Sequence, residues 1–151
     1  MPKIENAELL LSKYKKARTA LTNRIIQNEQ WYKLRHTAPV SEDNYIPASA
    51  WLFNSLAVKH ADAMSSIPAP YVSAREPSDT ESAETLSKLL PILLEYNDFP
   101  EVYSSIWNDK LKHGTGCYGV FWNPSASEGL GEIEIRRVDI LNLFWEPGVN
   151  D

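Results

Sequence analysis

The last third of the chain has the order of elements that most constrains its fold. A helical pattern ends at Gly114, and glycine commonly ends helices because it adopts the left-handed conformation without strain. Two strand-like runs follow, over residues 117–122 and 132–138, with a polar, glycine-containing turn between them. The second run alternates apolar and charged residues, as a half-buried strand does. The pattern predicts an antiparallel β-hairpin in which Ile133 and Ile135 are buried.

The other end of the chain predicts one long helix over residues 6–36, with Asn6 as its N-cap. Apolar residues recur there at spacings of three, four or seven and share one face. They are Leu10, Tyr14, Ala17, Leu21, Ile25 and Tyr32. The basic residues fall mostly off that face and are expected in solvent: Lys13, Lys15, Lys16, Arg18 and Arg24. A helix of this length measures about 45 Å, more than a small domain covers, so we expect it to reach another subunit or domain.

Between these ends, residues 47–66 form a helical pattern that is apolar on nearly every side, which is typical of a buried helix. We therefore expect Trp51 in the core. Residues 67–74 contain two prolines, which exclude a helix and indicate an extended segment ending in a short strand.

Two further helices are predicted, over residues 79–97 and 98–113. The first has a capping box formed by Ser78 and Glu81, and Pro91 should kink or split it. The second has an N-cap signature at Asp98. The side chains expected to point inward are Leu86, Leu90, Leu93, Val102, Ile106, Leu111 and one of Tyr103 or Trp107.

The predicted fold class is therefore α+β and mainly helical, with about four helices, the first long, and a C-terminal antiparallel β-hairpin or small sheet. We divide the chain into a long N-terminal helix (1–36), a helical core (37–113) and the hairpin with its tail (114–151). The apolar run before residue 147 needs a packing partner, so we expect the sequence to be the N-terminal part of a longer protein.

Composition argues against several classes of function. The 151 residues carry a formal net charge of −5, whereas a nucleic-acid-binding domain normally shows a basic excess. The single cysteine rules out an intramolecular disulfide and a cysteine-based zinc cluster. No apolar stretch approaches the roughly 18 residues that span a bilayer. We expect no cofactor, no metal and no membrane association.

The sequence also lacks a recognisable catalytic motif. Cys117 follows a helix C-terminus, which favours the neutral thiol rather than a thiolate paired with His113. The three histidines lie far apart in sequence, and the pair Gly114 and Gly116 follows a helix, whereas a phosphate-binding loop precedes one. We therefore expect the chain not to be an enzyme.

Aromatic residues are the stronger signal, because tryptophan favours cores and protein interfaces. The chain has five tryptophans, of which we assign Trp51, Trp107 and Trp122 to the core. The candidate subunit interface combines two other tryptophans with the stripe of the first helix. It consists of Leu10, Tyr14, Leu21, Ile25, Trp31 and Trp145.

The layout resembles one family, the portal proteins of tailed bacteriophages, in the wing region of the ring. The matching features are a helix containing Phe53-Asn54-Ser55-Leu56, a proline-rich crossing over 66–72, Gly-x-Gly followed by a strand over 114–122, and the ending over 138–147. The match spans nearly the whole chain.

This resemblance implies a structural subunit of a homo-oligomeric ring, usually of twelve copies, at one capsid vertex. DNA would be packaged and ejected through the ring without binding this region specifically. Partners would be the capsid or scaffold protein, terminase and a head-tail adaptor. The protein would reside in the virion after assembly in the host bacterial cytoplasm.

Two alternatives from other classes stay open. One is an adaptor module whose aromatic surface binds a protein partner. The other is a non-catalytic N-terminal part of a larger enzyme, whose active site would lie downstream.

Overall fold

The computed structural model describes residues 4–35 and 49–145, and helices account for 64% of them. The helices are α1 (Ile4–Ala17), α2 (Thr19–Tyr32), α3 (Trp51–Met64), α4 (Thr80–Tyr96) and α5 (Phe99–His113). The strands β1 (Cys117–Asn123) and β2 (Glu132–Val138) form an antiparallel hairpin. The predicted fold class, mainly helical α+β, is confirmed.

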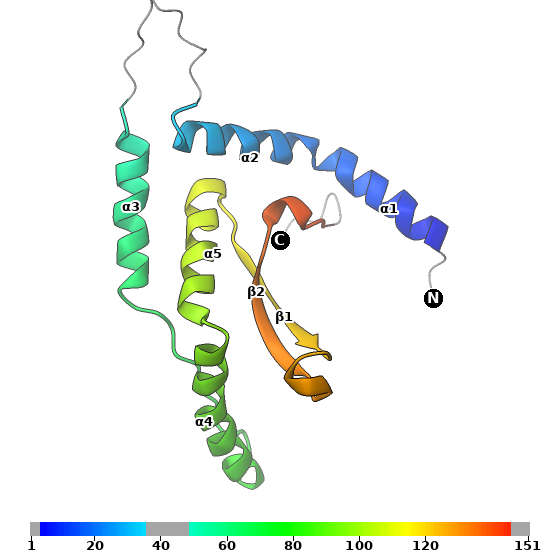
Figure 1. Cartoon of the computed structure of the whole chain (residues 1–151), viewed down its shortest axis with the longest axis vertical. Coiled ribbons are helices and arrows are strands. Elements are labelled where there is room, and N and C mark those ends of the chain that lie inside the picture. Colours follow the sequence, from blue (N-terminus) through cyan, green and yellow to red (C-terminus); the bar gives the residue numbers. More distant parts are fainter. Residues whose placement is uncertain (1–3, 36–48, 146–151) are drawn as a thin grey trace, which may run out of the picture.

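Helices α1 and α2 together form an arm across the top of the molecule (Figure 1). The predicted single helix is thus divided at Arg18, although hydrogen bonding continues across it: the Arg18 amide donates to Tyr14 and the Thr22 amide donates to Arg18. The helix begins at Ile4, so the Asn6 cap was wrong. It ends at Tyr32 rather than at residue 36, which lies outside the described residues.

Helix α3 runs beside α5 and, contrary to expectation, contains no buried residue (Figure 1). Trp51 is 77% exposed, so its assignment to the core was wrong. Within residues 4–35 and 49–145, contacts cover one face of α3: His60 hydrogen bonds to Ser104 of α5, and the Phe53 ring centre lies 5.5 Å from that of Tyr32 of α2. The apolar residues on its other faces have no cover from the rest of the described chain.

Helix α4 also departs from its predicted details. It starts after a short 3-10 turn, Pro77–Asp79, and the Ser78 hydroxyl donates to Asp79 instead of forming a capping box. Pro91 lies inside an unbroken helix, so the predicted split was wrong. Ala83 is buried, whereas Leu86, expected inside, is 45% exposed.

The segment before α4, residues 67–74, is extended as predicted but forms no strand. Its backbone is held by a side chain instead of a neighbouring strand. The Ser87 hydroxyl donates to the Val72 carbonyl at 2.9 Å and accepts from the Val72 amide at 3.1 Å.

Helix α5 is the centre of the packing. It ends as predicted at Gly114, which has φ 87°. Phe99, Ile106 and Asp109 are buried along it. At its start, Asp98 adopts φ 48° and its side chain accepts no capping hydrogen bond, so that part of the prediction was wrong.

The hairpin has the predicted strands, and its register pairs Val120 with Ile135 and Trp122 with Ile133. Opposed residues in a sheet share a face, so these four side chains lie on one side of the hairpin. Ile135 is buried, but Trp122 is 61% exposed, and its assignment to the core was wrong. The helices cover the β2 half of this face much better than the β1 half.

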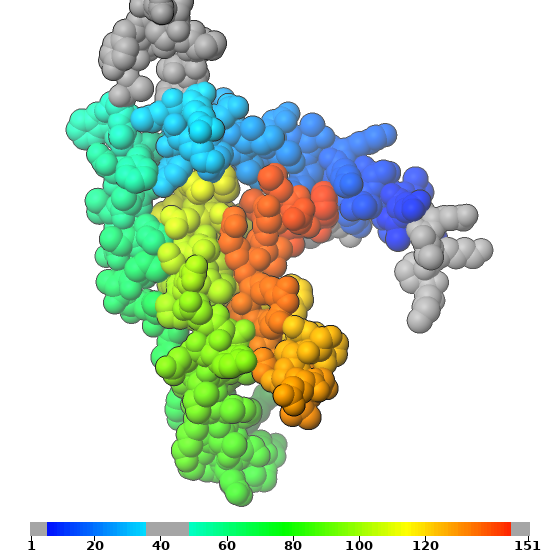
Figure 2. Space-filling view, viewed as in Figure 1, coloured from blue at the N-terminus to red at the C-terminus, as the bar shows by residue number. Residues whose placement is uncertain are grey.

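The resulting core is small for the described part of the chain. Its buried hydrophobic side chains are Ile25, Ala83, Phe99, Ile106, Ile135 and Ile140. Many more large hydrophobic side chains are exposed, and Figure 2 shows α1 projecting well away from the other helices. The fold leaves several apolar surfaces for other molecules to cover.

Candidate functional site

Arg18 anchors the arm to the C-terminal part of the described chain. Its side chain is buried, with only 7% of the residue exposed, and its guanidinium donates to the carbonyls of Ile140, Leu141 and Leu143. The bond to Leu141 measures 3.1 Å. These carbonyls belong to or directly follow the 3-10 helix η3 (Ile140–Asn142). The Ile140 carbonyl also accepts from the Leu143 amide, so Arg18 is its second donor. The expectation that Arg18 is a solvated surface residue was wrong.

The same guanidinium also lies over two aromatic rings. Its carbon is 5.0 Å from the ring centre of Phe144 and 5.6 Å from that of Trp145. Arginine stacks on aromatic faces because its cation is planar and weakly hydrated. Trp145, a predicted interface residue, is thus brought to the arm and remains 49% exposed. We call Arg18 and residues 140–145 the arm junction.

The structure separates the other predicted interface residues into two groups. Ile25 is buried with 4% exposed, and Tyr14 and Leu21 are half-buried. Leu10 and Trp31 are 44% and 47% exposed. Burial along the stripe therefore increases from the exposed Leu10 in α1, through the half-buried Tyr14 and Leu21, to the buried Ile25 in α2.

A cluster of charged side chains joins α2 to α5 below the arm. Glu29 lies 3.0 Å from Lys112 and 2.9 Å from Lys33. His113 Nε2 is 3.8 Å from Glu29, and its buried Nδ1 has no hydrogen-bond partner among the residues that the structure describes. Burial, followed by the nearby Lys112 charge, lowers the pKa of His113 below its ordinary value. The pKa of Glu29 is also lowered: its burial opposes this shift, but the hydrogen bonds and charges of the two lysines outweigh it.

A second ion pair joins α5 to β2. Asp109 is 3% exposed and accepts two hydrogen bonds from Arg137, at 2.5 Å to Nε and 2.8 Å to Nη2. The geometry is bidentate, the arrangement in which guanidinium and carboxylate bind most strongly. The hydrogen bond and charge of Asp109 raise the pKa of Arg137 against a smaller effect of burial. Both charged groups are explained by packing of the hairpin on α5.

An apolar groove of about 400 Å³ lies between the hairpin, α4 and the proline-rich segment. Its lining contains no carboxylate or amine. The lining residues are Pro68, Ala69, Pro70, Leu90, Leu93, Leu94, Phe99, Tyr118, Val120, Ile133 and Ile135. Such a surface suits apolar side chains of another protein, and Tyr118 is the one ionisable residue among those that line it.

The side of the hairpin next to α4 is closed by Asn97, the residue that follows α4. Its amide nitrogen donates to the Ile133 carbonyl at 3.1 Å, and its amide oxygen accepts from the Ile135 amide at 2.8 Å. The side chain thus imitates a neighbouring strand along β2. No sequence pattern indicated this role.

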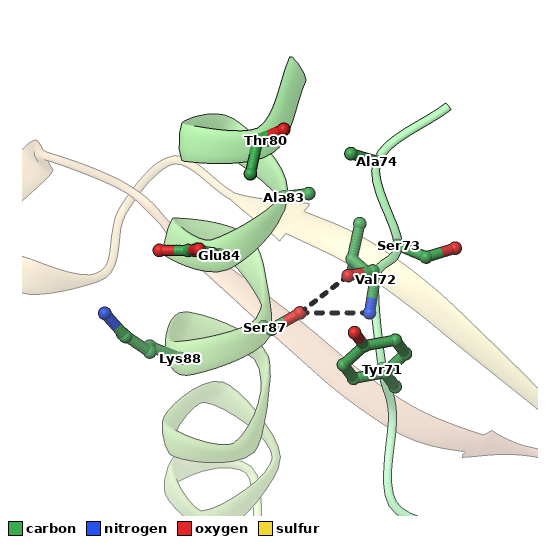
Figure 3. Close-up of a pocket in the computed structure, with 9 residues that line it drawn as sticks. All are labelled: Tyr71, Val72, Ser73, Ala74, Thr80, Ala83, Glu84, Ser87 and Lys88. Carbon is green, nitrogen blue, oxygen red and sulfur yellow. Dashed lines mark hydrogen bonds between the residues drawn. The ribbon is translucent and has the colours of Figure 1, made fainter. Parts of the chain in front are cut away.

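A more polar hollow of about 380 Å³ lies between residues 71–74 and α4 (Figure 3). Glu84 and Lys88 lie along the helix side, and Ser87 points across to Val72 (Figure 3). Because Ser87 is already satisfied by the Val72 backbone, this hollow presents no free buried polar group for a ligand.

Comparisons of the chain with protein-family models, curated protein sequences and solved structures find no match.

Within residues 4–35 and 49–145, no three His, Cys, Asp or Glu side chains are grouped to hold a metal ion. Cys117 is a half-buried free thiol, and the ion-pair partner of His113 is Glu29. In the same part of the chain, none of the helices has the length and hydropathy to cross a bilayer.

Sequence analysis missed Arg18, although a signal was present. Tyr14, Arg18, Leu21 and Ile25 follow one another at spacings of four, three and four, so Arg18 lies on the apolar stripe itself. A charged residue in that position indicates a buried partner.

Proposed function

We propose that the chain is part of a structural subunit of a tailed-bacteriophage portal ring, from the wing region. The ring would stand at one capsid vertex, with DNA packaged and ejected through it. The proposed family rests on the sequence resemblance to portal proteins, which covers residues 53–56, 66–72, 114–122 and 138–147. The activity we expect is assembly rather than catalysis.

The observation that best supports this proposal is the exposed half of the arm. Leu9, Leu10 and Leu11 in α1 are 70%, 44% and 40% exposed, and none of the described α1 side chains is buried. An apolar helix that projects from its own domain is stabilised when a second protein surface covers it. In a ring, a neighbouring copy supplies that surface.

The remaining partners follow from the same proposal. They are the capsid or scaffold protein, terminase and a head-tail adaptor, with the ring most often built from twelve copies. The net charge of −5 fits a part of the ring that does not bind DNA specifically. The assembled protein would reside in the virion.

The test is ring assembly by the full-length subunit, followed by electron microscopy and mass photometry. Replacing Leu9 and Leu10 together by serine should abolish or strongly reduce rings, while the melting temperature of the subunit changes little. Lys15→Ser, on an exposed position of a different face of the same helix, is the matched control and should assemble normally. Rings that form equally well from the leucine variant would contradict the proposal.

A protein-binding adaptor is the second candidate, and the apolar groove favours it. The two candidates differ in one measurement. An adaptor would stay monomeric at full length and bind a different protein, whereas a portal subunit would form closed rings of identical copies.

A further inference from the structure

The outer edge of β1 has hydrogen-bonding groups with no partner. Asn97 bonds to the Ile133 carbonyl and the Ile135 amide, so these groups point away from β1. In an antiparallel ladder, the residues opposite such positions also direct their amides and carbonyls outward. By the register these are Trp122 and Val120, and by alternation also Tyr118. Among the described residues, no hydrogen bond reaches the backbone of these three from outside the hairpin.

This edge also lacks the features that normally prevent strands from pairing. Natural sheets protect their edges with charged side chains, prolines or bulges. The seven residues of β1 include none with a formal charge and no proline, and they pair with β2 without interruption. Tyr118, Val120 and Trp122 are 54%, 63% and 61% exposed. The edge is long, apolar and open.

The apolar groove extends the same surface. Tyr118 and Val120 line it together with Leu90, Leu93 and Phe99. A strand added beside β1 would place alternate side chains on this face, where no carboxylate or amine lines the groove. The added strand must therefore be extended and uncharged.

We propose that β1 pairs edge to edge with β1 of a second copy of this chain, across a two-fold axis at Val120. The two hairpins then form one four-stranded antiparallel sheet. In this register Val120 faces Val120 of the partner subunit, and Tyr118 faces Trp122 of the partner subunit. Every outward amide of the three residues meets an outward carbonyl.

Charge favours a second copy as the occupant. Because β1 has no formally charged side chain, pairing it with itself places no like charges opposite each other. The cross-strand pair of tyrosine and tryptophan adds an aromatic contact, one of the favourable pairs in sheets.

The size of the contact predicts a weak dimer. An aromatic side chain can bury about 150–250 Å², so the half-exposed residues of β1 supply roughly 400 Å² per copy and about 800 Å² in total. Stable interfaces bury about 1,200–2,000 Å². Self-association should therefore depend strongly on concentration. It uses β1 rather than α1 and is independent of the proposed ring contact.

The test is sedimentation equilibrium of the chain from about 10 µM to about 1 mM, the range in which a small interface dissociates. The wild type should shift from monomer to dimer. Val120→Lys places two lysines opposite each other at the two-fold axis and should weaken the dimer at least about tenfold. Leu130→Lys adds the same charge at a position that is 83% exposed in the turn, and should dimerise like the wild type.

A second measurement uses the wild type alone, so its result does not depend on whether the variant folds. Amide hydrogen exchange of the wild type should slow at Tyr118 and Val120 as concentration rises, with no matching change in the amides that pair within the hairpin. A wild type that stays monomeric at the highest concentration overturns the proposal. So does a dimer that survives Val120→Lys, or one that is lost when Leu9 and Leu10 are replaced by serine.

Discussion

Replacing Arg18 by methionine tests whether the arm junction stabilises the fold. Methionine keeps most of the aliphatic length but removes the donors to Ile140, Leu141 and Leu143. A hydrogen bond from a charged donor contributes about 1.5–3 kcal/mol. Three such bonds cannot simply be added, because one guanidinium makes them all and its burial costs several kcal/mol in the wild type.

We expect a net loss of about 2–4 kcal/mol in the free energy of unfolding. The Leu141 and Leu143 carbonyls lose the guanidinium donor, the Ile140 carbonyl keeps only the Leu143 amide, and the stacking on Phe144 and Trp145 is lost as well. Small domains are stable by only about 5–15 kcal/mol in total. The change would therefore be a large fraction of the stability of this chain.

The assay is urea denaturation, read as a shift of the midpoint at constant m-value. The free energy of unfolding of Arg18→Lys should lie between those of Arg18→Met and the wild type. Lysine keeps a charged donor, but a single ammonium cannot reach three carbonyls in the same geometry. Arg24→Met on an exposed position of α2 is the control and should change the stability by less than about 0.5 kcal/mol. If Arg18→Met and Arg24→Met unfold at the same urea concentration, the reasoning about the junction is wrong.

Three further predictions follow from burial and charge. Trp51→Ala should lower the unfolding free energy by less than about 1 kcal/mol, because the residue is 77% exposed; a loss of 3 kcal/mol or more by denaturation, as expected of a core aromatic, would contradict the structure. The lowered pKa of His113 means that the folded chain resists protonation, so stability should be full above its ordinary pKa of 6.5 and fall as the pH drops below it. His113→Gln should flatten the pH profile of the melting temperature between about pH 7.5 and 5.5, and an unchanged slope would show that another group titrates. Arg137→Ala should cost about 2–3 kcal/mol because it leaves the buried Asp109 carboxylate unpaired, whereas removal of the exposed Lys13 side chain should cost almost nothing in the same melt.

The parts of the fold that sequence predicted well are those fixed by local rules. Gly114 ends α5 because its left-handed conformation is available to glycine without strain. The hairpin follows from two short runs with a turn between them, and the alternation around Ile135 identifies the buried face. Such features depend on neighbours within a few residues.

The predictions that were wrong concern burial, which depends on which elements of the fold pack against each other. An apolar helix such as α3 looks buried from its composition, but nothing in its sequence says whether the cover comes from the same chain. Trp51 and Trp122 were placed in the core for that reason, and both are exposed. The predicted helix caps at Ser78 and Asp98 were wrong for a different reason. At a helix start, a side-chain oxygen can form other local hydrogen bonds or leave the backbone amides uncapped, and the sequence does not decide between these geometries.

The predicted interface shows the same difference between local pattern and packing. The stripe from Leu10 to Ile25 was recognised as one face, but the fold uses its two halves differently. Asn97 and Arg18 were not recognised, since each acts on a backbone far away in the sequence. The bonds of Asn97 have no periodic pattern that reveals them, whereas the position of Arg18 on the apolar stripe was a signal that it is buried.

The division of the arm at Arg18 has a mechanical consequence. The 14 residues of α1 extend about 21 Å beyond this point, at 1.5 Å per residue. A rotation of about ten degrees there would move the far end of α1 by about 4 Å, close to the spacing between packed side chains. The bonds that hold the buried Arg18 guanidinium therefore also set the position of the exposed leucines of α1 relative to the rest of the fold.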